Sequence, residues 1–326
     1  MTRPVHIRAA GATAPAARRG RSAMARQEDR AGRALVAPTL LVVLAVVLVP
    51  FLATLLFAFQ DLRIIDIPNM SLSDVDLTLD NFAKVTSNSG FWSEMLTTLA
   101  YAVLSTLGSI GVGLVVALSL RRPFRGRGII RGLVLVPYVL PVVAAAMIWK
   151  TLLNTQYGFF NAFGQEFFGW NAPISFLSTT SQQFGGVSVP VTFLVVVAFE
   201  IWKSFPLAYL FITARLLAAQ DDIEEAALID GASPLQKFRY VIAPQLYGVI
   251  ALLSLLRFIW TFQNFNDIYL LTGGAGGTKV IAVRVYEELT NKADLGTASA
   301  LGLVMTAVLV GFLITYVRMS RAEVEE

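Results

Sequence analysis

Seven side chains that could carry chemistry stand inside two largely apolar stretches of the chain. They are Glu200, Lys203 and Ser204 in the first stretch, and Arg257, Thr261, Asn264 and Asp267 in the second. A charge at the centre of a bilayer costs about 2.5–3.5 kcal/mol on insertion scales, so such residues generally face a cavity or a partner of opposite charge. Three kinds of chemistry fit them: hydrogen bonding to a polar solute, proton carriage, and acid–base catalysis.

The residue types are compatible with a hydroxyl-rich solute such as a sugar. Planar side chains supply both donors and acceptors to hydroxyl groups, and an aromatic side chain offers a surface to the C–H face of a sugar ring. Trp260, Asn264 and Asp267 share one face of the predicted helix at i, i+4 and i+7 spacing. A purely structural role is the alternative to solute binding. In that case Glu200 would pair with Lys203 or with Arg257 and hold helices together.

Two other classes of protein remain open from these residues. Glu200 and Asp267 could carry protons in a transporter driven by an ion gradient, or act as acid and base in a membrane-embedded enzyme. Neither stretch contains a recognised catalytic motif, and we therefore predict no catalytic residue.

The elements that would hold these side chains are membrane spans. Of the 326 residues, 56% are hydrophobic and 15% are charged, against about 25% charged in a soluble domain. A transmembrane helix needs roughly 20 predominantly apolar residues. Six windows meet or nearly meet this requirement: 34–59, 95–120, 132–149, 187–217, 246–271 and 297–317. We predict an all-α membrane protein with six transmembrane helices over residues 34–318. Pro137, Pro141, Pro190 and Pro206 in or near the spans permit kinks that suit a moving transporter.

The distribution of basic residues predicts the orientation. Of the 26 Lys and Arg residues, 18 fall in segments on one side of the predicted spans, 5 on the other, and 3 in or beside the spans. Because short loops rich in these residues stay in the cytoplasm, both termini are predicted to be cytoplasmic in a bacterial-type cell membrane. The net charge of +4 is concentrated beside the membrane, which favours lipid headgroups over nucleic acid as its partner.

The two ends of the chain are predicted to be tails. Residues 1–33 are rich in Ala, Gly and Arg without apolar periodicity, which predicts a disordered cytoplasmic tail; residues 319–326 form a short second one. Arg18 and Arg19 could belong to an export signal, but the apolar run that follows is longer than such a signal carries. The chain has no cysteine and only His6 as histidine, so no metal site is predicted.

Residues 218–245 interrupt the apolar pattern with two short helices. Asp222 and Glu225 have the spacing of a capping box, and Gly231 suits the left-handed residue that follows a helix end. Ser233 and Pro234 then predict the start of a second helix. Pro244 is expected to close that helix before the chain re-enters the membrane. The small, partly acidic face of the first helix suits either a helix lying on the membrane or one that docks on another protein.

This interruption resembles the signature cytoplasmic loop of ABC importer permeases, the membrane subunits of binding-protein-dependent uptake systems. The matching strings are Glu225-Ala226-Ala227, Asp230-Gly231-Ala232 and Ile242-Ala243-Pro244. Ala243 departs from the Leu that the family usually has before the Pro. The strings "LVPYVLPVVAAAMIWKTLLNTQYGFFN", "EIWKSFPLAYLFITARL" and "FNDIYLLTGG" are also similar to segments of the carbohydrate branch, the maltose-type permeases.

The resemblance implies a permease fold, a transported sugar (an oligosaccharide or glycoside) and roles for particular residues. The coupling helix that enters a groove of the ATPase would include Glu225, Ala226, Ala227, Asp230 and Gly231. The sugar path would include Glu200, Lys203, Ser204, Thr261, Asn264 and Asp267.

It also implies that the ATPase is separate, because the chain has no P-loop motif. The nearest string, "GGAGGTK" from Gly273, is interpreted as a flexible turn on the outer side. The chain itself would bind no cofactor, and ATP and Mg would bind to partners. The implied partners are a second homologous permease, two ATP-binding subunits and an extracytoplasmic sugar-binding protein.

Overall fold

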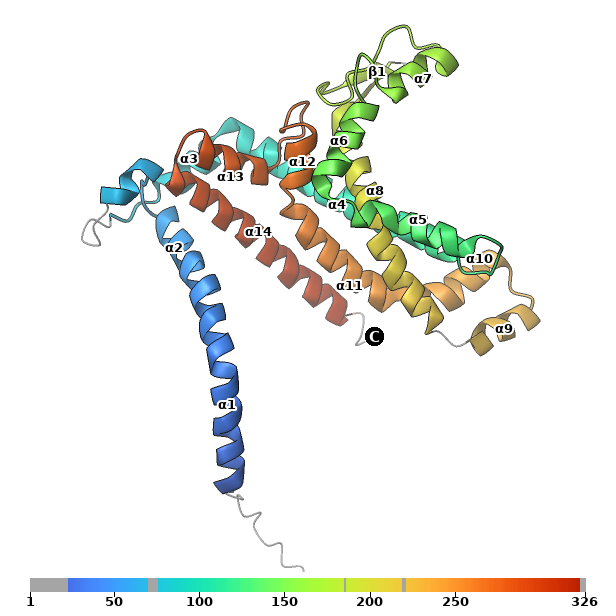
Figure 1. The fold of residues 1–326 in the computed structure, drawn as a ribbon, viewed down its shortest axis with the longest axis horizontal. Coiled ribbons are helices and arrows are strands. Elements are labelled where there is room, and N and C mark those ends of the chain that lie inside the picture. The colour runs from blue at the N-terminus through green and yellow to red at the C-terminus, as the bar shows by residue number, and fades with distance from the viewer. Residues whose placement is uncertain (1–22, 70–75, 185, 219–220, 323–326) are drawn as a thin grey trace, which may run out of the picture. The chain divides into compact units, whose positions relative to one another are not determined.

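The computed structural model describes residues 23–69, 76–184, 186–218 and 221–322. His6, Arg18 and Arg19 lie outside these ranges. The chain divides into two compact units, Met1–Thr54 and Leu55–Glu326, which we describe separately. The described residues are mostly helical (Figure 1), as predicted.

The first unit consists of the beginning of a long apolar helix. Its elements are α1 (Ala23–Val43), the π-helical turn η1 (Leu44–Leu48) and the first residues of α2 (Val49–Ala58). The candidate span Gly32–Ala58 has a mean hydropathy of 3.0. The helix begins at Ala23, so residues 23–33 are helical and the prediction of a disordered tail is wrong for them. Their composition explains this, because Ala, Arg, Glu and Gln are all good helix formers.

The second unit holds the remaining elements. Between the first two spans these are the 3-10 helix η2 (Ile64–Asn69) and α3 (Asp80–Ser87). The helices that follow are α4 (Ser89–Ser119), α5 (Arg127–Val139), α6 (Val142–Leu152), α7 (Phe159–Phe168), α8 (Val191–Leu217), α9 (Asp221–Ile229), α10 (Pro234–Lys237), the π-helical turn η3 (Phe238–Ile242), α11 (Ala243–Phe262), α12 (Asn266–Leu271), α13 (Ile281–Thr290) and α14 (Leu295–Ala322). The strands β1 (Gln182–Phe184) and β2 (Val187–Val189) form an antiparallel hairpin.

Over the described residues, five helices are long and apolar enough to cross a membrane, and a bent helix pair brings the number to six if the pair is counted as one span. This agrees with the predicted number, but several boundaries differ. Residues 187–189 belong to β2, and α8 begins only at Val191, after Pro190. At the other end, α14 continues to Ala322, so the predicted C-terminal tail begins as helix.

The third predicted span, 132–149, is not one continuous helix. α5 and α6 meet at an angle of 99° around Leu140 and Pro141, and they diverge clearly in Figure 1. Leu140 has φ −62° and ψ 134°, an extended conformation. A residue that precedes proline is disfavoured in the helical region because its backbone clashes with the proline ring. Pro137 and Pro206, in contrast, lie inside α5 and α8 without ending them.

The second helix of the cytoplasmic interruption was predicted to end at Pro244, and this prediction is wrong. It is continuous from Pro234 to Phe262. The π-helical turn η3 precedes the proline, and the Ala243 N–H bonds to the Phe238 carbonyl five residues back. This wider turn lets the helix accept a proline, which lacks the N–H that a regular α-helical turn would use.

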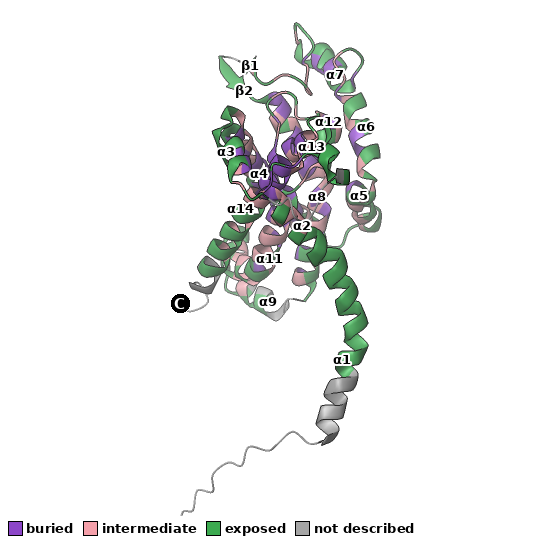
Figure 2. Cartoon of the chain, turned by 90° about the vertical axis from the view of Figure 1, so that its left-hand side faces the viewer, coloured by how far each residue is buried: buried purple, intermediate pink, exposed green. Residues whose placement is uncertain are grey.

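The core of the second unit lies where α4, α8 and α11 pack together, and Figure 2 shows the buried residues gathered along these helices. Gly113 on α4 permits close approach to α8, since a Cβ at this position would lie 2.6 Å from the Ala208 Cβ. Small residues allow membrane helices to pack closely by van der Waals contact. A buried ion pair joins α13 to α4, with the Arg284 Nη1 2.9 Å from the Glu94 carboxylate.

Candidate functional site

A network of charged and polar side chains crosses the middle of the helical core. Glu200 on α8 is 2% exposed and forms an ion pair with Arg257 on α11. It also accepts a hydrogen bond of 2.9 Å from the Ser204 hydroxyl, one turn further along α8. The Lys203 Nζ lies 3.3 Å from the other Glu200 oxygen. Glu200 therefore pairs with both of the partners that the sequence suggested, Lys203 and Arg257.

The second half of the network is centred on Asp267, at the start of α12. Lys203 donates to both Asp267 oxygens, at 2.5 Å to Oδ1. The Asn264 side chain donates to Asp267 at 2.7 Å and to the Glu200 Oε2 at 3.3 Å. Two acidic and two basic groups thus offset each other's charge, which compensates for much of the cost of removing them from water.

The break between α11 and α12 positions Asn264. α11 ends at Phe262 and α12 begins at Asn266, so the prediction that Trp260, Asn264 and Asp267 share one helical face is wrong. Asn264 lies between the helices, and its side-chain oxygen accepts from the Asp267 N–H at 3.2 Å. An amide side chain that bonds nearby backbone competes with helix continuation, which accounts for polar residues at such a break.

The network borders a cavity of about 330 Å³. Its lining comes from α5, α6, α8, α11 and the break after α11: Tyr138, Leu140, Val142, Glu200, Lys203, Ser204, Arg257, Trp260 and Asn264. Four of the six predicted path residues are in this lining. Thr261 and Asp267 are not, and they lie behind it, 1% and 0% exposed.

Each of the two residues behind the lining holds a side chain that lines the cavity. The Thr261 hydroxyl accepts from Arg257 at 3.2 Å, and Asp267 holds Lys203 and Asn264. Neither residue lines this cavity, and their place in the sugar path stays a prediction.

Arg257 and the break in the third span were missing from the predicted site. The Arg257 Nε is buried and has no hydrogen-bond partner among the described residues. Its charge inside a span had identified Arg257, but as an ion-pair partner of Glu200 and not as a lining residue. Leu140 and Val142 carry no polar signal; they reach the cavity because the chain bends at Pro141.

The cytoplasmic interruption has the predicted turn. The Ala232 N–H bonds to the Ala227 carbonyl at 3.0 Å, and Gly231 has φ +75°, as expected for a glycine after a helix end. Ser233 and Gln236 form a reciprocal capping box, with the Ser233 N–H 2.8 Å from the Gln236 side chain.

The first helix of the interruption begins earlier than predicted. α9 begins at Asp221, so Asp222 lies in its first turn and is not the predicted N-cap. Glu225, Ala226, Asp230 and Gly231 are exposed, and Ala227 is half-buried.

One continuous helix links this turn to the cavity. It begins at Pro234, directly after the capped Ser233, and ends at Phe262. Arg257 and Trp260 therefore belong to the same helix that starts at the cytoplasmic turn. The Arg215 Nε donates to the Gln245 carbonyl at 3.0 Å, which ties the end of α8 to this helix.

Membrane-spanning helices around a polar cavity, one of them broken beside it, define an integral membrane transport subunit. The family of the binding-protein-dependent transport system inner membrane component matches residues 109–322, and the chain belongs to this family. It is a multi-pass protein of the inner membrane, and its family consists of transport permease subunits.

Individual relatives cover most of the chain. It is 34% identical over 279 residues to the inner membrane ABC transporter permease protein YcjO of Escherichia coli, covering 84% of this chain and 89% of YcjO. It is 30% identical over 297 residues to the trehalose/maltose transport system permease protein MalF of Thermococcus litoralis, covering 90% and 95%.

A solved structure has the same fold. It is a bacterial ABC transporter involved in the import of the acidic polysaccharide alginate, with a TM-score of 0.77 at 20% identity, covering 91% of this chain and 96% of the other. The predicted permease fold is confirmed.

Proposed function

We propose that this chain forms one half of the translocation pathway of an ATP-driven importer for a carbohydrate, an oligosaccharide or glycoside. The observation that carries the proposal is the cavity beside the broken third span, where four charged or polar residues of α8 and α11 meet Asn264. Broken helices next to a polar cavity are typical of transporter binding sites. The trehalose/maltose relative supports a sugar as the solute.

The cavity offers both kinds of contact that a sugar uses. Asn264 and Ser204 line the cavity and supply polar atoms for hydroxyl groups. Trp260 and Tyr138 line the same cavity, and their rings can pack against the C–H faces of a sugar. Glu200, Lys203, Ser204 and Asn264 would contact the solute, whereas Thr261 and Asp267 would hold those contacts in place.

The coupling loop, residues 218–245, would transmit ATP hydrolysis to this cavity. Glu225, Ala226, Ala227, Asp230 and Gly231 would form the part that docks on the ATPase. An exposed helix with small side chains allows close approach of another surface. Because one helix continues from Pro234 to Phe262, a movement at the turn would shift Arg257 and Trp260 directly.

The proposed function requires several partner proteins. Two ATP-binding subunits would bind ATP and Mg, a second homologous permease would complete the pathway, and an extracytoplasmic binding protein would deliver the sugar. The glycine-rich string from Gly273 has four glycines with positive φ, which suits a turn between α12 and α13 better than a nucleotide site. Both termini would lie in the cytoplasm, with residues 34–318 as the membrane domain.

Uptake into proteoliposomes tests the proposal against its main rival. The chain is reconstituted with its neighbouring permease, ATPase and binding protein, and labelled oligosaccharides are supplied outside. We expect uptake that requires ATP inside and the binding protein outside, and no uptake by the purified chain under a proton gradient. Uptake by the chain alone, driven by the gradient, would support an ion-driven transporter and refute the proposal.

A further inference from the structure

A second cavity, of about 440 Å³, lies at the end of the membrane core that carries the coupling loop. One wall comes from the end of α4 and the connection to α5, with Leu118, Arg121 and Arg122. The other wall comes from α10 and η3, with Lys237 and Ile242. We refer to these five residues as the basic pocket. None of them lines the cavity described above, and Lys237 and Ile242 belong to the coupling loop.

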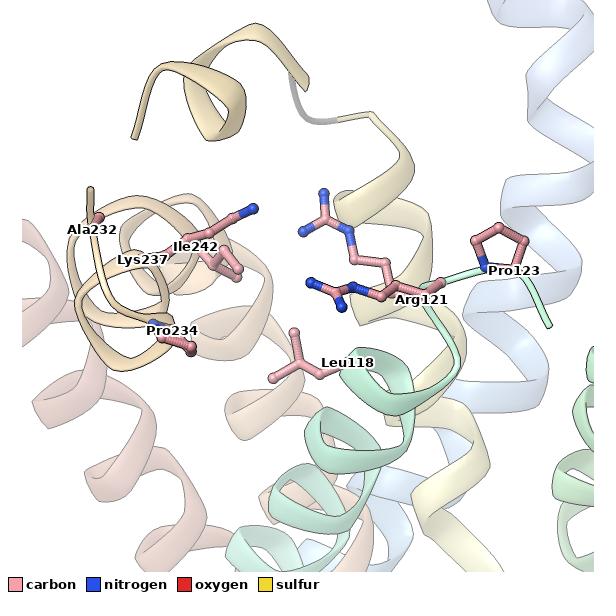
Figure 3. A pocket seen from close by; sticks show the side chains of 8 residues that line it. Leu118, Arg121, Pro123, Ala232, Pro234, Lys237 and Ile242 are labelled. Carbon is pink, nitrogen blue, oxygen red and sulfur yellow. The ribbon is translucent and has the colours of Figure 1, made fainter. Parts of the chain in front are cut away.

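The pocket combines convergent positive charge with an apolar base. Figure 3 shows the side chains of Arg121 and Lys237 entering the space from opposite walls, with Leu118 beneath them. Leu118 belongs to the last turns of α4, and Ile242 closes η3 just before the apolar part of α11. The pocket therefore lies at the boundary between the apolar helices and the basic loops, with cationic groups on the loop side.

This combination matches a particular ligand chemistry. The guanidinium and ammonium groups of Arg and Lys are favourable partners for phosphate oxygens. Anionic lipids attract basic segments beside a membrane, and basic pockets between helices on the cytoplasmic side bind lipid head groups. An inorganic phosphate would use the cations but not the apolar base. A phospholipid would use both, because its acyl chains could follow the apolar surface that begins at Leu118 and Ile242.

We infer that the basic pocket binds the phosphate of an anionic phospholipid headgroup in the cytoplasmic leaflet. The inference rests on the proposed function, which places this end of the helices at the cytoplasmic face. A headgroup held by Arg122 and Lys237 would bridge the α4–α5 connection and the helix that runs from the coupling loop to the cavity. Anionic lipid would thereby fix the angle of that helix and support the coupling of ATP hydrolysis to transport.

Binding of a nitroxide-labelled phosphatidylglycerol tests the inference directly. The complete transporter is placed in nanodiscs of phosphatidylcholine, and the immobilised fraction of the labelled lipid is measured by electron paramagnetic resonance. For Arg122→Gln/Lys237→Gln, we expect about thirty-fold weaker binding of the label, since two basic residues near the membrane surface are lost. The charge-conserving Arg122→Lys/Lys237→Arg should bind the label like the parent.

The matched control is Arg125→Gln/Arg239→Gln, which removes two exposed basic side chains from the same segments outside the pocket. It should weaken binding much less than the pocket variant does. An equal loss of label binding in both neutralised variants would mean that the lipid is attracted by the basic segments in general and not by the pocket. That result would overturn the inference. Displacement of the label by millimolar inorganic phosphate would also overturn it, in favour of a free phosphate site.

Hydrolysis of ATP separates this inference from the proposed function. Stimulation by the loaded binding protein should be higher in nanodiscs containing phosphatidylglycerol than in phosphatidylcholine alone, and Arg122→Gln/Lys237→Gln should lose the difference. Equal stimulation of the parent transporter in both lipids would refute the lipid inference and leave the importer intact. Absence of stimulation in either lipid would contradict the proposed function itself.

Discussion

Glu200 on α8 and Arg257 on α11 form an ion pair, 57 residues apart in the chain, with both side chains more than nine-tenths buried. The pair joins the two helices that flank the coupling loop. Lys203 and Asp267 extend it to α12, so three elements meet at one charge network. Any change in the angle between α8 and α11 must act on this contact, which makes it a natural point for alternating access.

Removing one partner of this pair should be much worse than removing both. Arg257→Met leaves Glu200 with less compensation in a buried site, and loss of one partner of a buried ion pair costs about 3–5 kcal/mol. We expect Arg257→Met and Glu200→Gln each to lower the unfolding temperature of the purified subunit, and the double variant to recover part of the loss. The double-mutant cycle is measured by thermal unfolding in detergent. Additive losses of stability would show that the two side chains are not coupled.

Asn264→Leu should weaken transport without preventing assembly. The side chain lines the cavity and bonds to both Asp267 and Glu200, so its loss removes polar contacts at the solute. The measurements are uptake kinetics and recovery of the complete complex. Gln263→Leu is the matched control, because Gln263 is an exposed neighbour in the same break and does not line the cavity. Unchanged uptake kinetics in Asn264→Leu would exclude Asn264 from the path.

Gly231→Pro should abolish uptake while the subunit remains inserted in the membrane. Gly231 has φ +75°, whereas proline is restricted to φ near −65°, so the turn between α9 and α10 cannot form. Gly248→Ala in α11 is the control, since a Cβ there meets nothing within 4 Å and Ala is a better helix former than Gly. Uptake and membrane content are measured together; normal uptake by Gly231→Pro would refute the coupling role of this turn.

Glu225→Lys should reduce retention of the ATPase rather than insertion. Glu225 is exposed on α9, and a reversed charge on a docking face opposes a partner that suits the original one. The readout is the amount of ATPase that co-purifies with the tagged permease. Glu166→Lys, on the exposed surface of α7 and outside the coupling loop, serves as a comparison for reversed charge in general. Full recovery of the ATPase with Glu225→Lys would argue for a helix that merely lies on the membrane.

The proposed orientation can be tested by cysteine labelling, because the chain has no native cysteine. Ser233→Cys should be protected from a membrane-impermeant maleimide in intact cells and react in inside-out vesicles. Ser188→Cys on the exposed strand β2 should show the opposite pattern. The two sites are separated by one span, α8. Labelling of Ser233→Cys in intact cells would place the coupling loop outside and contradict the proposed function.

The sequence by itself determined the mainly helical membrane class, the five continuous candidate spans, the Gly231 turn and the helix start at Ser233. Each of these is a local property: hydropathy over some 20 residues, a glycine after a helix end, or hydrogen bonds between residues three apart. The polar residues of the candidate site were also identifiable, because an ionisable group inside an apolar stretch stands out without knowledge of its neighbours.

Only the tertiary structure decided which of these residues meet and which of them face the cavity. Periodicity gives neither the rotation of one helix against another nor the angle at Pro141, so it could not place Leu140 beside Glu200 or Asp267 behind Lys203. The same holds for the helix that continues through Pro244, where a local π-helical turn outweighs the usual effect of proline. Side-chain pairing across helices depends on packing over many residues, and a single stretch of sequence does not contain that information.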